Sequence, residues 1–167
     1  MNQNTILNIG VLGAANIATR SMVPSIICIP DMFRLAGLAS RNLAKAKSVT
    51  DTYGGSPYDS YEALLSDPSI NAVYIPLPNA LHFPYVKMAL GYGKHVLVEK
   101  CLGCNLEEVD ELVDVAAKEN LILLENFQFR FHSQLKTILQ LIKTGEIGDL
   151  RSVKVAFGFP PLEVNNI

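Results

Sequence analysis

A run of small residues follows the first apolar segment of the sequence and opens an amphipathic stretch. Residues 10–18 read GVLGAANIA, in which Gly13 can form the tight turn of a dinucleotide-binding loop. Ala15 replaces the second glycine of that pattern and is small enough for a pyrophosphate to approach, while Ala18 allows close helix packing. Asn16 and Ile17 then fall at the helix N-terminus, where backbone N–H groups bind anions. The segment predicts a dinucleotide site, and the alternative is that its small residues serve packing alone.

Ser40 and Arg41 follow the second apolar segment, where many NAD enzymes carry an acidic residue for the ribose hydroxyls. A serine hydroxyl and a guanidinium instead supply hydrogen-bond donors and positive charge, which suit a 2′-phosphate. We therefore expect NADP as the cofactor, with NAD as the alternative. The competing interpretation is an exposed arginine at the start of a helix that binds nothing.

Glu99 and Lys100 end an apolar segment that reads VLVEK. Open α/β sheets bind their ligands at the carboxyl ends of the strands, which is where this pair would lie. Lys100 can hydrogen-bond a substrate hydroxyl or carbonyl and help to move its proton, so it is our catalytic candidate and also a cofactor contact. Glu99 could hold Lys100 or contact the cofactor ribose. An exposed Glu-Lys pair without a function is the alternative.

A proline-rich loop, IPLPNALH, follows a third apolar segment. Its two prolines stiffen the backbone, and we expect Leu77, Pro78 and Asn79 to pass beneath the nicotinamide. Asn79 is also expected to cap the next helix. His82 lies on the first turn of that helix and completes our list of cofactor contacts, although a lone histidine is more often structural.

The three cysteines are an odd number without dense spacing, which argues against a disulfide framework. Cys101 and Cys104 form a C-x-x-C pattern that suits a redox pair or half of a zinc site. A zinc site requires a second pair of ligands, and the sequence offers none at the right spacing. We favour unpaired thiols and predict no metal site.

The elements that position these motifs follow from hydrophobic periodicity. Short apolar runs alternate with amphipathic stretches, which predicts βαβ units around a buried parallel sheet in the doubly wound α/β (Rossmann) architecture. The helix that starts near Asn16 should restart with Pro24 close to its beginning. The expected strands cover residues 6–12, 33–39, 72–75, 95–98 and 121–124, and the other expected helices cover residues 42–53, 60–65, 79–90 and 105–119. These helices open with an Asn or Ser, such as Asn42, Ser60 and Asn105, whose side chain can cap the first backbone N–H groups.

The character of the sequence changes after residue 125. An amphipathic helix is expected at residues 133–143, and strict alternation then places Val153, Val155, Phe157 and Phe159 on one side of a half-exposed strand. We therefore predict a nucleotide-binding domain at residues 1–125. Residues 126–167 should form the linker helix and first strand of a second, incomplete α/β domain.

Composition excludes several classes of protein. A length of 167 residues accommodates one full domain and little more, and a net charge of −2 gives no electrostatic footprint for nucleic acid. No apolar run approaches the roughly 18 residues of a membrane span, and the N-terminus lacks the positive start of a secretory signal. We expect a cytoplasmic protein with neither a nucleic-acid nor a membrane partner.

Taken together, in this order and spacing, the motifs resemble those of the Gfo/Idh/MocA family of NAD(P)-dependent oxidoreductases along essentially the whole chain. The similar segments are the turn at Gly13, the pair Ser40-Arg41, and residues 78–82, 99–101, 125–134 and 145–148. Two positions depart from the family pattern. Cys101 stands where proline usually follows Glu-Lys, and Phe129 replaces a tyrosine that is common among related members.

The resemblance implies a Rossmann domain followed by an α/β domain with a large open sheet, which shapes a sugar site and supports homo-oligomers. It also implies that Lys100 is catalytic and works with a His, Tyr or Asp that these residues do not reveal. The expected activity is hydride transfer between NADP(H) and a secondary alcohol or ketone of a sugar, nucleotide-linked or free. A non-catalytic NADP-binding or sensing module is the alternative from another class.

Overall fold

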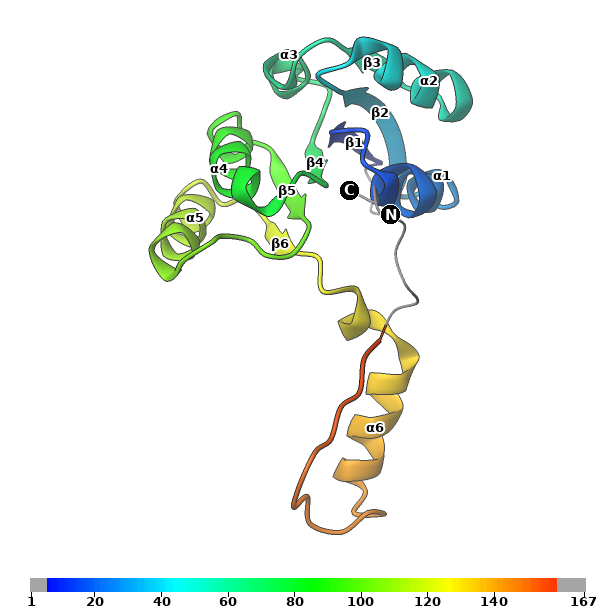
Figure 1. Cartoon of the computed structure of the whole chain (residues 1–167), viewed down its shortest axis with the longest axis vertical. Helices are drawn as coiled ribbons and strands as arrows, with labels where there is room; N and C mark the ends of the chain where they lie inside the picture. Colours follow the sequence, from blue (N-terminus) through cyan, green and yellow to red (C-terminus); the bar gives the residue numbers. More distant parts are fainter. Residues whose placement is uncertain (1–5, 159–167) are drawn as a thin grey trace, which may run out of the picture. The chain divides into compact units, whose positions relative to one another are not determined.

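The central sheet has six strands, all parallel, in the order β3-β2-β1-β4-β5-β6. The computed structural model describes residues 6–158. β1 pairs with β2 on one side and with β4 on the other, so the direction in which strands are added reverses at β1 (Figure 1). This order confirms the predicted doubly wound fold. The strands are β1 (Leu7–Leu12), β2 (Phe33–Ala39), β3 (Ser56–Tyr58), β4 (Ala72–Ile75), β5 (His95–Val98) and β6 (Leu123–Glu125).

The connections between successive strands are mostly helical, as right-handed parallel crossovers require. Pro24 occupies the first turn of the helix that leads to β2, as predicted, but the backbone stays helical through the preceding residues and no break separates the two segments. A π-helical turn, η1, precedes that helix directly. The elements are η1 (Ala18–Met22), α1 (Val23–Ile27), α2 (Leu43–Tyr53), α3 (Tyr61–Ser66), η2 (Asn79–Leu81), α4 (His82–Gly91), α5 (Leu106–Lys118), η3 (Gln128–Phe131) and α6 (Ser133–Lys143).

Two apolar clusters lie on opposite faces of the sheet. Val11 and Leu12 are neighbours in β1 and are both fully buried, yet they belong to different clusters because successive strand side chains point to opposite faces. The cluster of Leu12 packs against α3, α4 and α5, whereas that of Val11 packs against α1 and α2. Figure 1 shows α4 and α5 on one side of the sheet and α1 on the other. Both faces are therefore covered, which explains the continuous apolar runs of the strands.

Polar side chains start three of the crossover helices. Asn42, Ser60 and Asn105 accept hydrogen bonds from backbone N–H groups in the first turns of α2, α3 and α5, which confirms their predicted capping role. The cap satisfies donors that have no partner within the helix. These residues fix where each helix leaves the edge of the sheet.

The predicted cap at Asn79 is wrong. The Leu81 N–H group bonds to the Pro78 carbonyl at 2.8 Å, so residues Asn79–Leu81 form a tight 3-10 turn. The α-helix begins only at His82, without a side-chain cap. A first turn of this kind satisfies its N–H groups through the backbone, and Asn79 is not needed for that purpose.

The sequence did not predict β3. This strand has three residues, includes Pro57 and lies at the edge of the sheet, where it pairs only with β2. Proline cannot donate a ladder hydrogen bond, and an edge position tolerates that loss. A segment so short, with no apolar run, carries no periodicity from which a strand could be inferred.

The chain divides into two compact units, Met1–Asn126 and Phe127–Ile167. In the second unit α6 forms over the predicted residues 133–143, and the His132 ring accepts a hydrogen bond from its first turn. Residues 151–158 have no regular structure, Phe159 lies outside the described residues, and the strand expected there as the start of a second domain stays a prediction. A strand needs a hydrogen-bonding neighbour, and residues 127–158 contain no strand that could serve as one.

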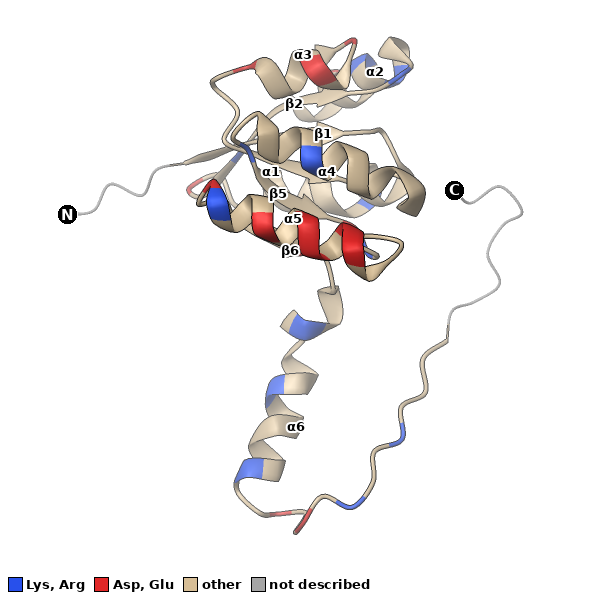
Figure 2. Cartoon of the chain, turned by 90° about the vertical axis from the view of Figure 1, so that its left-hand side faces the viewer, with Lys and Arg blue, Asp and Glu red and all other residues tan. Residues whose placement is uncertain are grey.

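Charged residues lie on the exposed faces of the helices, and acidic ones gather on α5 (Figure 2). Glu107 and Glu108 occupy its first turn, where negative charge complements the helix dipole. Glu111 forms an ion pair with Lys87 of α4. Between residues 6 and 158, no helix has both the length and the apolar character that crossing a membrane requires.

A polar cluster holds the turn that leads into β4. The Tyr58 hydroxyl donates to Asp67 Oδ2 at 2.6 Å. Lys94 is buried, and its Nζ donates to the carbonyls of Asp67 and Ile70 at 2.7 and 2.8 Å. The hydrogen bonds from Tyr58 and Ser69 lower the pKa of Asp67 to about 2, whereas burial and the bond to Asp67 raise the pKa of Tyr58 to about 12.

These shifts predict two pH windows in which the protein loses stability. The lowered pKa of Asp67 stabilises the fold at neutral pH, and this contribution should disappear as the pH falls from about 4 to about 2. The raised pKa of Tyr58 contributes below pH 10 and should be lost as the pH rises from about 10 to about 12. Urea-unfolding midpoints measured across both ranges should therefore fall less steeply in Tyr58→Phe than in the wild type.

The matched control is Tyr92→Phe, because Tyr92 is an exposed tyrosine outside this cluster. Its midpoints should follow the wild-type pH profile in both windows. If Tyr58→Phe also followed that profile, the hydrogen bond to Asp67 would not be the origin of the pH dependence.

Candidate functional site

The carboxyl ends of the parallel strands bring the predicted site residues to one edge of the sheet. Gly13 follows β1, Ser40 follows β2, Leu77 comes two residues after β4, and Glu99 follows β5. Because neighbouring strands run in the same direction, their following loops are neighbours as well. The sequence placed these residues after separate strands, and the sheet order decides which of them are adjacent.

The turn at Gly13 contacts the loop that follows β4. Gly13 is buried, has φ +115°, and donates its N–H group to the Ala39 carbonyl at 2.8 Å. A Cβ atom at this position would come within 2.9 Å of Leu77 Cδ2. The backbone conformation therefore requires glycine here, and a Cβ atom would also push the end of the Leu77 side chain aside.

The helix that follows this turn presents its N-terminus at the same edge. The N–H groups of Ala18 and Thr19 bond to the Ala15 carbonyl at 3.0 and 3.2 Å, so the helical hydrogen bonds begin with these residues. The N–H groups of Ala14 and Ala15 precede that ladder, in the position at which helix N-termini bind anions. Ala15 is half-buried and Ile17 is 38% exposed, so the side chains at this helix N-terminus are either small or partly accessible to solvent.

Ser40 and Arg41 have different environments. Ser40 is buried, and its hydroxyl accepts a hydrogen bond from the Asn42 N–H group at 3.2 Å, which shapes the turn between β2 and α2. Arg41 is exposed and forms no ion pair or hydrogen bond within residues 6–158. Its guanidinium is therefore free to bind an anionic ligand.

Arg41 lines a small hollow of about 170 Å³ at the start of α3. Tyr61 and Tyr85 meet edge to face in its wall, with ring centroids 4.9 Å apart. Burial raises the pKa of the Tyr61 hydroxyl, and the positive charge of Arg41 acts in the opposite direction. The hollow thus combines aromatic surface with one cation, and its other lining residues are Asp59, Ser60 and Glu62.

His82 joins the loops that follow β4 and β5. Its ring is fully buried, with Nε2 2.6 Å from the Leu77 carbonyl oxygen and Nδ1 2.5 Å from the Cys101 carbonyl oxygen. Both ring nitrogens are thus occupied by backbone groups. His82 therefore contributes to the site through the loops that it joins, and its own surface is not available to a ligand.

The Glu99 carboxylate receives two hydrogen bonds on one oxygen. The Tyr74 hydroxyl and Asn126 Nδ2 both donate to Glu99 Oε1 at 2.7 Å. Burial, and then the bond to Glu99, raise the pKa of Tyr74 far above the usual range of tyrosine. The roles of Tyr74 and Asn126 were not predicted from the sequence. A tyrosine inside a buried apolar strand and a polar residue directly after the last strand are nevertheless signals that a sequence shows.

Lys100 is exposed and makes no hydrogen bond or ion pair with any described residue. The suggestion that Glu99 holds Lys100 is therefore wrong. Glu99 bonds instead to the Tyr74 hydroxyl and the Asn126 side-chain amide. The Lys100 ammonium group remains available at the edge of the sheet.

Side chains hold the loop that follows Lys100 at three points. His82 contacts the Cys101 carbonyl, Glu125 Oε1 accepts from the Leu102 N–H group at 2.9 Å, and Glu108 Oε2 accepts from the Cys104 N–H group at 2.8 Å. The loop thus has partners from α4, β6 and α5. Cys101 replaces a proline of the family pattern, and these contacts restrict the backbone where proline would have done so.

The cysteines do not form a disulfide. Cys28, Cys101 and Cys104 are all free and exposed, as the sequence analysis favoured. Among residues 6–158 no three His, Cys, Asp or Glu side chains lie close enough together to hold a metal ion.

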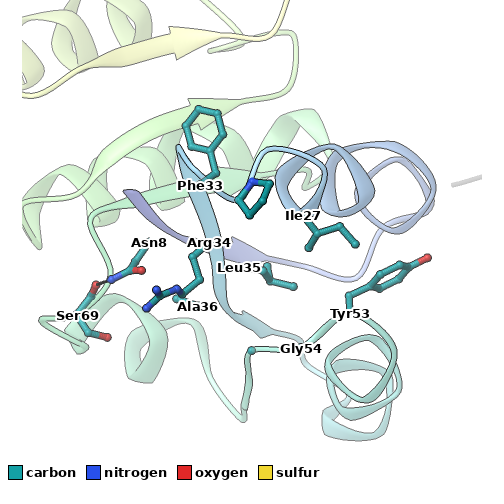
Figure 3. A pocket seen from close by; sticks show the side chains of 11 residues that line it. Asn8, Ile27, Phe33, Arg34, Leu35, Ala36, Tyr53, Gly54 and Ser69 are labelled. Atoms are coloured by element: carbon teal, nitrogen blue, oxygen red, sulfur yellow. Dashed lines mark hydrogen bonds between the residues drawn. The ribbon is translucent and has the colours of Figure 1, made fainter. Parts of the chain in front are cut away.

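The larger cavity lies at the opposite edge of the sheet. It measures about 630 Å³, and its lining includes Asn8, Phe33, Arg34 and Tyr53, which lie at the starts of β1 and β2 and the end of α2 (Figure 3). None of the predicted site residues lines it. Choosing a binding site by cavity volume alone would therefore point to the wrong edge of the sheet, because ligands of doubly wound sheets bind at the carboxyl ends of the strands.

A comparison with models of protein families shows to which family this chain belongs. Residues 7–127 match the model of the Gfo/Idh/MocA oxidoreductases, an oxidoreductase family with an NAD-binding Rossmann fold. The chain belongs to this family. The match ends one residue after Asn126 and thus spans every motif at the carboxyl edge of the sheet.

Relatives in this family reduce or oxidise sugars. A dTDP-3,4-didehydro-2,6-dideoxy-alpha-D-glucose 3-reductase of Streptomyces violaceoruber is 40% identical over 96% of this chain and 47% of its own length. D-xylose 1-dehydrogenase (NADP(+)) 2 of Haloferax volcanii is 39% identical over 90% of this chain and 46% of its own. A 3-ketoreductase from Actinomadura kijaniata, crystallised with NADP and TDP-benzene, shares 37% identity and a TM-score of 0.81 over 84% of this chain and 43% of that chain. The chain spans about half the length of the curated relatives it matches.

The contact between Gly13 and Leu77 predicts a specific effect of adding one methyl group. Gly13→Ala should cost about 1–2 kcal/mol of stability because of its positive φ, and it should also displace Leu77 at the candidate site. We expect the Kd for NADPH to rise about tenfold or more, which corresponds to about 1.4 kcal/mol of binding free energy. Fluorescence titration of the full-length protein would measure this change.

Gly54→Ala is the matched control. Gly54 also has a positive φ, +86°, but a Cβ atom there would meet nothing within 4 Å. This variant should lose a similar amount of stability and keep its affinity for NADPH. An equal loss of affinity in both variants would contradict the assignment of the Gly13 turn to the binding site.

Proposed function

We propose that the full-length protein transfers a hydride between NADP(H) and a secondary alcohol or ketone of a sugar. The observation that carries the proposal is the uncommitted Lys100 ammonium group at the carboxyl edge of the sheet, next to the anchored Glu99. The Gly13 turn and the free guanidinium of Arg41 lie at the same edge. Formation of a homo-oligomer through the second domain stays a prediction from the family resemblance.

The residues present fit a dinucleotide. The Gly13 turn packs against Leu77 without a side chain of its own, and the helix after it offers N–H donors to the pyrophosphate. Arg41 supplies a cation where an acidic residue would select NAD, so NADP is favoured. Asn16, Ile17 and Ser40 complete the proposed phosphate-binding side, and Leu77, Pro78 and Asn79 the proposed nicotinamide side.

Lys100 would perform the proton transfer. When bound, the nicotinamide cofactor gives or takes the hydride at the substrate carbon. The Lys100 ammonium group would donate a hydrogen bond to the substrate oxygen, and during reduction it would supply the proton that converts the carbonyl to a hydroxyl. In the oxidative direction neutral Lys100 would accept that proton. The fixed loop after Lys100 limits the positions that its backbone can adopt.

The substrate class follows from the relatives. The Streptomyces violaceoruber protein is named for reduction of a dTDP-linked dideoxy sugar, and the Haloferax volcanii protein for oxidation of xylose. Both substrates are sugars with several secondary hydroxyl or keto carbons. We propose a sugar for this protein as well, and a nucleotide-linked deoxy sugar as its first candidate.

Replacing Lys100 separates catalysis from binding. Lys100→Met in the full-length protein should reduce kcat by about 10²- to 10⁴-fold, because the proton donor is lost while the aliphatic stem remains. The Kd for NADPH should stay within about threefold of the wild type, since Lys100 makes few of the proposed cofactor contacts. Turnover with dTDP-linked keto sugars and free sugars, and NADPH titration, would measure the two effects.

The control is Lys118→Met, which makes the same substitution at an exposed lysine in the last turn of α5. Its turnover should equal that of the wild type. If Lys100→Met retained full turnover, Lys100 would have no part in the mechanism. A wild-type protein that binds NADPH but oxidises or reduces no sugar would instead support an NADP-sensing module.

Arg41 should determine the choice between the two nicotinamide cofactors. Arg41→Ala removes a charge-assisted bond of about 1.5–3 kcal/mol, so the Kd for NADPH should rise about 10- to 100-fold. The Kd for NADH should change by less than about twofold, because NADH lacks the 2′-phosphate. Parallel titrations with both cofactors would check this result.

Arg34→Ala provides the comparison at the other edge of the sheet, where Arg34 lines the larger cavity. It should leave the Kd values of NADPH and NADH unchanged. Equal weakening of both cofactors by Arg41→Ala would mean that Arg41 does not contact the 2′-phosphate.

A further inference from the structure

We propose that Tyr74 and Asn126 are positioning residues that fix the Glu99 carboxylate so that its second oxygen accepts a hydroxyl of the cofactor ribose. This proposal rests on the NADP-dependent function proposed above. Neither side chain needs to touch the cofactor, because each acts through Glu99. The prediction is thus a coupling among three residues that come from three neighbouring strands of the sheet.

The donors approach Glu99 from both sides. β5 lies between β4 and β6, and Glu99 directly follows β5. Tyr74 belongs to β4 and Asn126 directly follows β6, and both donate to Glu99 Oε1 at 2.7 Å. Bonds of this length to a carboxylate are in the range of charge-assisted hydrogen bonds. Two such bonds from opposite sides restrict rotation of the carboxylate more than either could alone.

The donors themselves are held firmly. Tyr74 is 1% exposed and its ring packs in the apolar cluster beneath α1, so its hydroxyl has little freedom to move. Asn126 is 8% exposed, and its N–H group donates to the Val98 carbonyl at 2.8 Å. The Glu99 N–H group donates to the Ile75 carbonyl at 3.1 Å. Backbone and side-chain bonds therefore fix this carboxylate relative to both adjacent strands.

Tyr74 remains a donor throughout the physiological range. Its pKa is raised first by burial and then by the neighbouring Glu99 carboxylate, so the phenol stays protonated. An amide donor such as Asn126 does not titrate at all. The two bonds to Glu99 are accordingly insensitive to pH near neutrality.

The second carboxylate oxygen is left open. Glu99 Oε2 has no hydrogen-bond donor among residues 6–158, and it forms no ion pair with Lys100. Every buried side-chain nitrogen or oxygen in this part of the chain has a partner, so an unpartnered Oε2 must lie at the surface. A carboxylate can accept about four hydrogen bonds, and only two of these positions are filled. Oε2 is thus a fixed acceptor at the edge where the cofactor is proposed to bind.

A double-mutant cycle tests this coupling. In the full-length protein, Tyr74→Phe and Asn126→Ala should each raise the Kd for NADPH about threefold to tenfold, because Glu99 is held less firmly. Glu99→Ala should raise the Kd at least as much. When either change is added to Glu99→Ala, the Kd should rise by no more than about 1.5-fold, because the residue through which they act is already gone. Fluorescence titration measures each Kd, and circular dichroism checks folding.

Tyr58→Phe is the matched control, since Tyr58 also donates to a carboxylate, that of Asp67, but away from the site. It should lower the melting temperature and leave the Kd unchanged. Equal increases of the Kd in the wild-type and Glu99→Ala backgrounds would overturn the positioning role, as would unchanged affinity in both single variants. A wild-type protein without affinity for NADPH would overturn the proposed function itself, and the positioning role with it.

Discussion

The parallel pairing of β1 with β2 on one side and with β4 on the other is the constraint on which the site depends. Because both pairs run in the same direction, the loops after these three strands meet at one edge. The Gly13 turn then lies against Leu77 of the loop after β4, and its N–H group continues the bonding to β2 at Ala39. A side chain at Gly13 would strain the backbone and displace the Leu77 side chain.

Hydrogen bonds between loops complete what the sheet begins. Beyond the ends of the strands the backbone groups lose their ladder partners and must find others. His82, Glu125 and Glu108 supply partners to the segment after Lys100, each from a different element. This arrangement explains how the segment is held although Cys101 replaces the proline that is usual in the family. The same three contacts thus provide hydrogen-bond partners for the backbone of this segment and hold the segment next to Lys100.

Glu99 and Lys100 show how adjacent residues acquire different roles. They follow one strand, yet Glu99 receives donors from both neighbouring strands while Lys100 makes no hydrogen bond or ion pair with any described residue. A carboxylate is costly to bury unless it is hydrogen-bonded, and Tyr74 and Asn126 meet that requirement. One fixed acceptor and one exposed cation thus lie at the same edge of the sheet.

The sequence by itself determined the fold class, most strand bounds and the caps at Asn42, Ser60 and Asn105, because periodicity and capping depend on residues close in the chain. It also located the motifs that follow the strands. Only the tertiary structure decided that Tyr74 and Asn126 hold Glu99, that His82 is buried between two loops, and that Pro57 belongs to an edge strand. Those contacts join residues from different strands and loops, and local patterns carry no information about which distant partner a side chain meets.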